Sequence, residues 1–396
     1  MLTNYRSEAV CPVSSLNSCL FSHRIKHPHW MECQLTLQAS EPDRFGMQRL
    51  EPFLTAAGTV ILNADFFGEY EQLAFLSRQM QIPGNAEPET TLLLDAGVAG
   101  GTHISTLSGV NTTPIFDRGR IIGRSFEDPD AKYCWLGGVL PADPTAPRDV
   151  QAGQVLQTIH RALAEAGMHF RDVVRTWFYV DRILDWYGEF NRVRTAFFEQ
   201  NGVISLPAST GIGAPNAAGA AVVAKVIAML PKNSNVEIKR IQSPLQCEAS
   251  AYGSSFSRAM EVRDSSTRTL YVSGTASIEP AGRTVHAGNA AKQIETTMEV
   301  VCALIEEAGM VLTDTTRAIA YFRHSEHIPL WHDYCRKRQL LPLPIILIPS
   351  DICRDDLLFE IELDAARALD CDNDSTQNLR RRQNSRSCIP LKLFSE

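Results

Sequence analysis

Apolar and acidic residues alternate strictly over residues 359–363, close to the end of the chain. Successive side chains of a strand point to opposite faces, so the apolar residues share one face while Glu360 and Glu362 share the other. The pattern predicts a strand that has one face in a hydrophobic core and two carboxylates on the opposite face.

A second strand with one polar face is predicted over residues 317–323. Arg317, Tyr321 and Arg323 fall on one face, and the small apolar residues between them fall on a face suited to packing under helices. Two guanidinium groups separated by a phenol can hold a planar carboxylate. Arg175 takes the place of Arg317 in an earlier, similar stretch of the chain.

That similarity belongs to an internal repeat. Residues 162–182 and 303–324 share the letters EAGM, which begin at Glu165 and Glu307, and later acidic and basic residues keep the same separation. Around this segment each copy has the pattern of two strands, a helix, a strand, a second helix and a final strand. Strands mixed with two helices indicate an α+β protein of two tandem units, each a mixed sheet with helices on one face.

The expected domain boundaries follow from these patterns. Residues 41–240 hold the first copy together with extra hairpins, and residues 241–368 hold the second copy. Residues 1–40 show no sustained periodicity and are expected to form a poorly ordered tail. Residues 369–396 are polar and are expected to form a disordered tail at the other end.

Composition excludes several classes of function. The 396 residues carry a formal net charge of -7, which argues against binding to nucleic acid or to an anionic membrane surface. Ten cysteines without a CxxC pair indicate reduced thiols in a cytoplasmic protein. No apolar stretch approaches the ~20 residues of a membrane-spanning helix, and the N-terminal region has no clean signal-peptide core.

Glu360 is the main candidate for chemistry. The first copy has Val223 and Lys225 near the positions of the two acids, so only one copy carries the carboxylates. A duplicated unit that keeps an acid in one copy only is typical of a functional site. The alternative is that both acids are surface carboxylates of an edge strand, and the pattern alone leaves both interpretations open.

Cysteine and histidine residues are weaker candidates. Cys353 would need a cationic setting to act as a nucleophile, and it is better explained as a buried wall residue of a pocket. His324, His327 and His332 lack a zinc-binding spacing and cross a strand-to-helix junction. No metal site is therefore predicted.

Each copy resembles the RidA/YjgF-like (chorismate-mutase-like) fold through a strand that ends in Ser-Gly, the EAGM segment with the DVVR-type turn after it, and the closing EIEL strand. Two such copies in one chain resemble the chorismatase family. The motifs that carry this resemblance span roughly residues 95–368 and include YCWLGGVLP, FRDVVRTWFYVDRILDWYGEFN, LPASTGIGA, SPLQC, YGSSFSRA, LYVSGTASI, AIAYF and CRDDLLFEIELDA.

The resemblance implies hydrolysis of the enolpyruvyl ether of chorismate without a metal or organic cofactor. The products would be pyruvate and either 3-hydroxybenzoate or a trans-dihydroxycyclohexadiene carboxylate, feeding secondary-metabolite biosynthesis. The resemblance also implies that Glu360 is the acid of the last strand and that Arg317 is the strand arginine. Cys353 matches the 3-hydroxybenzoate-forming branch of the family, whereas Ala276 matches the diol-forming branch.

Chorismate carries two carboxylates, so its site needs cationic groups at two ends. Arg317 and Arg323 are candidates for one carboxylate, with Tyr321 between them, and Arg175 is a weaker candidate because it lies in the other copy. Protonation of a vinyl ether requires a carboxyl group that keeps its proton, whereas an ordinary glutamate has a pKa near ~4.3. The site must therefore raise the pKa of Glu360 by burial or by a neighbouring anion.

Two other functions are compatible with the sequence. One is an enamine/imine deaminase of the RidA type. Residues 341–350 count against it, because they lack the Pro-Ala-Arg element whose arginine holds the substrate carboxylate. The other is a non-catalytic small-molecule-binding protein, which would need no proton donor.

Single-copy relatives close as trimers, so the chain is expected to form either a homotrimer or a pseudo-trimeric monomer.

Overall fold

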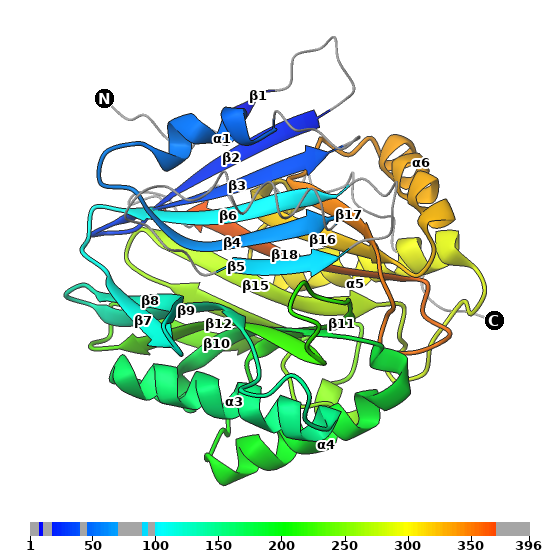
Figure 1. Ribbon diagram of the computed structural model, residues 1–396. Coiled ribbons are helices and arrows are strands. Elements are labelled where there is room, and N and C mark those ends of the chain that lie inside the picture. Colours follow the sequence, from blue (N-terminus) through cyan, green and yellow to red (C-terminus); the bar gives the residue numbers. More distant parts are fainter. Residues whose placement is uncertain (1–7, 11–17, 40–45, 70–88, 94–99, 370–396) are drawn as a thin grey trace.

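Three six-stranded sheets make up the body of the protein (Figure 1). The computed structural model describes residues 8–10, 18–39, 46–69, 89–93 and 100–369. We name the part that contains each sheet unit 1, unit 2 and unit 3, in chain order.

Each unit has six described strands with a helix between the third and the fourth, and units 2 and 3 have a second described helix after the fourth strand. Unit 1 contains β1 (Glu8–Val10), β2 (Ser18–Lys26), β3 (Met31–Ala39), α1 (Gly46–Leu54), β4 (Val60–Gly68), β5 (Glu89–Leu93) and β6 (Gly101–Ser108). Unit 2 contains β7 (Thr113–Asp117), β8 (Arg120–Glu127), β9 (Ala131–Val139), α3 (Arg148–Glu165), β10 (Val173–Val180), α4 (Ile183–Gln200), β11 (Ala208–Gly213) and β12 (Val222–Pro231). Unit 3 contains β13 (Glu237–Ile241), β14 (Ala259–Arg263), β15 (Thr267–Ala276), α5 (Ala290–Glu307), β16 (Thr315–Phe322), α6 (Ile328–Arg338), β17 (Ile345–Pro349) and β18 (Phe359–Ala368).

The sheets also share their strand order. The orders are β1-β2-β3-β6-β4-β5, β7-β8-β9-β12-β10-β11 and β13-β14-β15-β18-β16-β17. Each sheet ends in one parallel pair, namely β4 with β5, β10 with β11, and β16 with β17. A register shift interrupts the neighbouring antiparallel pair just before Asn63, Arg175 and Arg317, so these three residues occupy equivalent positions.

The predicted α+β class and the two tandem mixed sheets are confirmed. The predicted N-terminal boundaries are wrong, because residues 18–39 form two long strands and residues 41–240 contribute strands to all three sheets. The pattern was missed because the polar side chains of β3, Glu32, Gln34 and Thr36, are buried too. The tail predicted over 369–396 lies outside the described residues, apart from residue 369.

Helices cover one face of the sheets of units 2 and 3 (Figure 1). In α5, Ile294, Met298 and Ile305 recur at helical spacing and pack with Ala320 of β16 in one buried cluster. Burial of each such large side chain contributes about 1.5–3 kcal/mol. The helix ends before Gly309, whose φ of 68° is the left-handed conformation that glycine commonly adopts just after a helix.

The opposite faces of the three sheets share a second interior. One buried cluster joins Trp30 and Phe67 of unit 1, Trp177 of unit 2, and Tyr271 and Tyr321 of unit 3. The faces that carry the alternating polar residues of β10, β16 and β18 therefore point toward other units and away from solvent. The alternative of surface carboxylates on an edge strand is wrong, because Glu360 and Glu362 are buried and β18 lies inside its sheet.

Hairpin turns from all three units meet beside this interior. His27, in the β2–β3 turn, places Nδ1 2.7 Å from Oδ2 of Asp264 in the β14–β15 turn. In the same turn of unit 1, Trp30 Nε1 donates to Oδ2 of Asp128, which follows β8 in unit 2, over 3.1 Å. Burial opposes the charge of His27, but the hydrogen bonds and charges of Asp264 and Glu32 outweigh it and raise the pKa of His27. An ion pair thus ties unit 1 to unit 3.

No helix in the described part of the chain has the length and apolar character needed to cross a membrane.

Candidate active site

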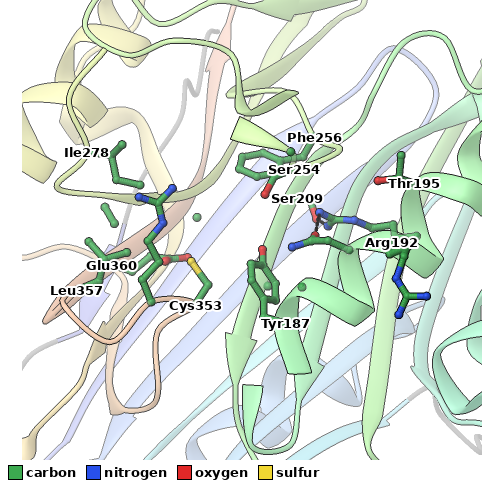
Figure 2. A pocket seen from close by; sticks show the side chains of 18 of the residues that line it. Tyr187, Arg192, Thr195, Ser209, Ser254, Phe256, Ile278, Cys353, Leu357 and Glu360 are labelled. Atoms are coloured by element: carbon green, nitrogen blue, oxygen red, sulfur yellow. Dashed lines mark hydrogen bonds between the residues drawn. The ribbon is translucent and has the colours of Figure 1, made fainter. Parts of the chain in front are cut away.

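A cavity of about 560 Å³ lies between unit 2 and unit 3, beside the facing strands β11 and β15. Unit 2 lines it with side chains of α4 and β11, and unit 3 lines it with the segments around β14, β15 and the start of β18. Figure 2 shows Glu360, Cys353, Leu357 and Ile278 at one side, Thr195 and Arg192 at the other, and Tyr187 between them.

Glu360 is the acid of this cavity. It is the second residue of β18, and it pairs with Ala276 on one neighbouring strand and with Tyr321 on the other. Its side chain is almost fully buried, at 5% exposure. Burial, and after it the charge of Glu362, raise the pKa of Glu360 to about 8, against the opposing charges of Arg175 and Arg258. At neutral pH the group is therefore mostly a protonated carboxylic acid.

Gly274 lies directly beneath that carboxyl group. A Cβ atom on Gly274 would lie 2.1 Å from Oε1 of Glu360, which is far inside contact distance. A side chain at this position would force the acid to move. The absence of a side chain at residue 274 is thus a condition for the observed position of Glu360.

Glu362 is the partner of the arginines that the sequence assigned to the substrate. Its carboxylate accepts from Arg175 at 2.5 Å and from Arg317 at 2.9 Å, and Arg317 also donates to Asp364 at 3.2 Å. Burial opposes the charge of Glu362, but Arg317 and Arg175 outweigh it and lower the pKa. Neither arginine lines the cavity. Buried acids of unit 3 bind both arginines, and their predicted role as ligands of a substrate carboxylate stays a prediction.

Tyr321 and Arg323 also lie outside the lining of the cavity. Tyr321 is buried in the interior shared by the three units. Arg323 lies 3.3 Å from Asp351 and 3.6 Å from Asp355, both on the loop that precedes β18. Of the residues predicted for the site, the structure brings together Glu360, Cys353 and Ala276 in the cavity wall.

Besides Arg192, which is exposed and pairs with Glu189, three other arginines line the cavity and were missed by the sequence analysis. Arg194, on α4, donates to Oδ1 of Asn191 at 2.7 Å and to Oγ of Ser209 at 3.4 Å. Arg258 donates to the carbonyl oxygen of Cys247 at 2.9 and 2.7 Å, and Arg354 donates to that of Gly282 at 2.7 Å. Each of these guanidinium groups brings a positive charge to the cavity wall. The cavity can therefore attract an anion at more than one point.

One signal in the sequence pointed to Arg194. It falls among the phenylalanines of α4, four residues after Phe190, on the stripe that a helix turns toward its sheet. A charged residue on such an apolar stripe is buried, at 1% exposure here, and needs a polar environment there. The other two arginines lie on irregular segments, where no periodicity marks them.

Tyr187 and Cys353 form part of the wall near the acid. Helix α4 is kinked at Trp186, whose φ is -150° and whose Nε1 donates to the carbonyl of Asp181 at 2.9 Å. The kink directs Tyr187 into the cavity (Figure 2). Desolvation, followed by the nearby charge of Glu360, raises the pKa of Cys353 to about 12, so it is a thiol at neutral pH. This favours a wall residue over a nucleophile.

The strand that borders the cavity is β11, whereas β17 packs toward unit 1. Residues 341–350, whose lack of a Pro-Ala-Arg element counts against a deaminase, do not line the cavity, and that expectation stays a prediction. The sequence Pro207-Ala208-Ser209 enters β11 and places Ser209 in the cavity wall. Among the described residues, no three His, Cys, Asp or Glu side chains are grouped as metal ligands.

Comparisons with known proteins agree with this architecture. The family model described as Endoribonuclease L-PSP matches residues 135–242. The chain is 28% identical over 259 residues to a 3-hydroxybenzoate synthase of Streptomyces hygroscopicus, covering 59% of this chain and 74% of that protein. It is 29% identical over 215 residues to a chorismatase of the same organism, covering 48% of this chain and 60% of that protein.

A solved chorismatase structure is similar over most of the chain. It superposes with a TM-score of 0.58 at 19% identity, covering 77% of this chain and 93% of the other. At that identity the similarity shows the fold. The sequence match spans less than two thirds of the curated chorismatase and about three quarters of the 3-hydroxybenzoate synthase.

Proposed function

The chain belongs to the chorismatase family, and we propose that it cleaves the enolpyruvyl ether of chorismate to pyruvate and 3-hydroxybenzoate. One observation carries the proposal: a buried glutamic acid with a pKa of about 8 lies in a cavity that four arginines also line. A vinyl ether needs a proton donor that is still protonated at neutral pH, and a dianion needs cations.

Binding would use the arginines of the cavity. Arg194 lies in unit 2, and Arg258 and Arg354 lie in unit 3, so the guanidinium groups approach the cavity from both units. Chorismate has one carboxylate on its ring and one on its side chain, and the two need separate partners. We assign Arg194, with Ser209 and Asn191, to one carboxylate, and Arg258 or Arg354 to the other.

The chemistry begins with proton transfer from Glu360 to the terminal methylene carbon of the enolpyruvyl group. An oxocarbenium ion forms, and Glu360 becomes a carboxylate. If water adds to the cation, it gives up a proton to Glu360, and the hemiketal breaks into pyruvate and a ring diol. If the neighbouring ring hydroxyl instead attacks the ring carbon that bears the ether, an epoxide forms as the bond from that carbon to the ether oxygen breaks and pyruvate leaves. The hydroxyl proton passes to Glu360, and the epoxide rearranges to 3-hydroxybenzoate, so that no water is consumed.

The product depends on the wall near the acid. Cys353 matches the branch of the family that forms 3-hydroxybenzoate, and Ala276, which pairs with Glu360, matches the branch that forms the diol. The curated relative with the greater coverage is a 3-hydroxybenzoate synthase, which supports the aromatic product. Positioned acid catalysis supplies about 10²–10⁴-fold of the acceleration, and orientation and electrostatics supply the rest.

The three units in one chain favour a pseudo-trimeric monomer over a homotrimer. All three sheets already face a common interior within the chain, so no second copy is needed to cover them. Size-exclusion chromatography with light scattering tests this: a mass near 43.9 kDa is expected, and a mass three times larger would contradict it.

The function is tested by incubating the purified protein with chorismate. Pyruvate release is followed with lactate dehydrogenase, and the ring product is identified by chromatography. Glu360→Gln is expected to abolish pyruvate release while chorismate still binds in calorimetry, and Glu295→Gln, on the exposed side of α5, serves as the matched control. Full turnover by Glu360→Gln would refute the role of the acid. If the folded wild-type protein released no pyruvate, a deaminase or a small-molecule-binding protein would remain as the candidate functions.

A further inference from the structure

Thr210 lies behind the cavity, at the contact between β11 of unit 2 and β15 of unit 3. It is buried, at 1% exposure, and it does not line the cavity, although its neighbours Ser209 and Gly211 do. Its hydroxyl donates to Oε2 of Glu362 and accepts from NH2 of Arg175 at 2.8 Å and from the backbone N–H of Gly274 at 3.1 Å. A hydroxyl has one donor and two acceptor lone pairs, so all of them are used.

Gly274 donates its backbone N–H to Thr210 from an irregular point of its strand. The pairing of β15 with β18 shifts register between Val272 and Thr275, so Gly274 lies in a bulge. A second bond across the same contact runs from the backbone N–H of Ser209 to Oγ of Ser273, over 2.9 Å. The bulge is therefore held from unit 2 by two consecutive residues of β11.

The bulge is also the support of the acid. The carboxyl of Glu360 lies against Gly274, as the 2.1 Å distance to a Cβ there shows. Thr210 thus contacts the backbone beneath Glu360 with one lone pair, and contacts the anion of Glu362 with its proton. No other described side chain makes both contacts.

We propose that Thr210 is a positioning residue of the acid: its hydroxyl fixes Gly274 and Glu362 relative to each other, and so holds Glu360 buried where it can donate its proton. The expected effect on chorismate turnover rests on the proposed function, whereas the expected effect on the position and protonation of Glu360 does not. Loss of the hydroxyl releases the bulge, admits solvent to Glu360 and leaves Glu362 less well held. All of these changes favour the ionised form of Glu360.

The test compares Thr210→Val, which keeps the shape, with Thr210→Ser, which keeps the hydroxyl. In chorismate turnover, Thr210→Val is expected to lower kcat by about 10- to 100-fold with KM nearly unchanged, because a displaced acid loses rate and the cavity wall is intact. The alkaline limb of the kcat profile is expected to move toward lower pH. Thr210→Ser is expected to restore both. Thr315→Val, which removes a buried hydroxyl bonded to the carbonyl of Leu312, is the matched control.

A second measurement needs no turnover. The carboxyl resonance of Glu360 is assigned in ¹³C-glutamate-labelled protein by its absence in Glu360→Gln and is then titrated with pH. Its midpoint is expected near 8 in the wild type and clearly lower in Thr210→Val. If Thr210→Val does not fold, Thr210→Ala gives the same comparison. An unchanged midpoint and an unchanged kcat in a folded variant would overturn the inference. A shifted midpoint in a protein that releases no pyruvate would support it and refute the proposed function alone.

Discussion

Replacing Glu360 with glutamine is expected to stabilise the folded protein, increasingly so as the pH rises. The unfolded chain releases the proton of a glutamate near its ordinary pKa of 4.5, whereas the folded protein holds it up to about 8. Between these values the folded state binds more protons than the unfolded state, so the wild type loses stability as the pH rises. Glutamine resembles the protonated acid in shape and does not ionise, so Glu360→Gln escapes this loss.

The magnitude follows from the size of the shift. With a pKa of 4.5 unfolded and about 8 folded, ionisation lowers the free energy of unfolding by about 1 kcal/mol at pH 5, about 3 kcal/mol at pH 7 and about 4 kcal/mol at pH 8. The loss levels off above pH 8, at about 5 kcal/mol. These values are a large fraction of the total stability of a typical protein.

Urea unfolding followed by tryptophan fluorescence measures the effect at pH 5, 7 and 8. The difference between Glu360→Gln and the wild type is expected to grow over this range, and Glu295→Gln is expected to show no such trend. The slope decides the question, because a general effect of the substitution would shift stability equally at each pH. A pH-independent difference in the free energy of unfolding would mean that Glu360 does not keep its proton in the folded protein. The proposed role of Glu360 as proton donor would then be refuted.

Gly274→Ala is expected to displace the carboxyl group of Glu360 and to lower the rate of pyruvate release at least ~100-fold. The control Gly153→Ala, in α3 with open space around the new Cβ, is expected to keep activity and to raise the free energy of unfolding by up to ~1 kcal/mol. Equal activities of the two variants in the coupled assay would contradict this. Arg194→Met is expected to weaken chorismate binding, measured by calorimetry, by about 10- to 100-fold through the loss of a charged hydrogen bond. An unchanged affinity would show that Arg194 does not bind the substrate. His27→Gln is expected to destabilise the protein mainly below pH 6.5. The raised pKa means that the ion pair with Asp264 is complete there and is lost as the pH rises through the folded value; a constant difference at pH 6 and 9 would refute the pair.

The sequence predicted the position of Glu360 because that position depends on local rules. Period-two alternation places the acid on one face of β18, and the repeat identifies which strands lie beside it. The same alternation continues through Glu362 to Asp364, opposite Arg317, and counting those acids would have shown that the arginine has partners on its own sheet. Most of this polar face is a buried contact between units, and alternation alone does not distinguish such a contact from a binding surface.

Arg194, Arg258 and Thr210 could not be predicted in the same way. Their roles depend on how unit 2 docks against unit 3, and no local periodicity encodes that contact. Unit 1 was missed for a related reason. Its strands bury polar residues such as Gln34 and Thr36 against the other units, so the ordinary contrast between an apolar face and a polar face is absent.

Only one of the three similar units carries the acid. In equivalent pairs across the sheets, Tyr321 faces Glu360, Tyr179 faces Val223, and Phe67 faces Gly101. Units 1 and 2 therefore lack a carboxyl group at this position. The missing side chain is not the whole difference, however, because the neighbouring position on each strand differs as well.

Two residues further along each strand, Glu362 corresponds to Lys225 of unit 2. Lys225 is buried and forms an ion pair with Asp65 of unit 1, which holds it in place. A glutamate introduced by Val223→Glu would have this ammonium group as its neighbour, and a cation favours the ionised form of an acid, whereas Glu362 favours the protonated form of Glu360. Val223→Glu is therefore expected to add a carboxylate that donates no proton, and in Glu360→Gln it is expected not to restore pyruvate release. Restored turnover would show that the anion beside Glu360 is dispensable.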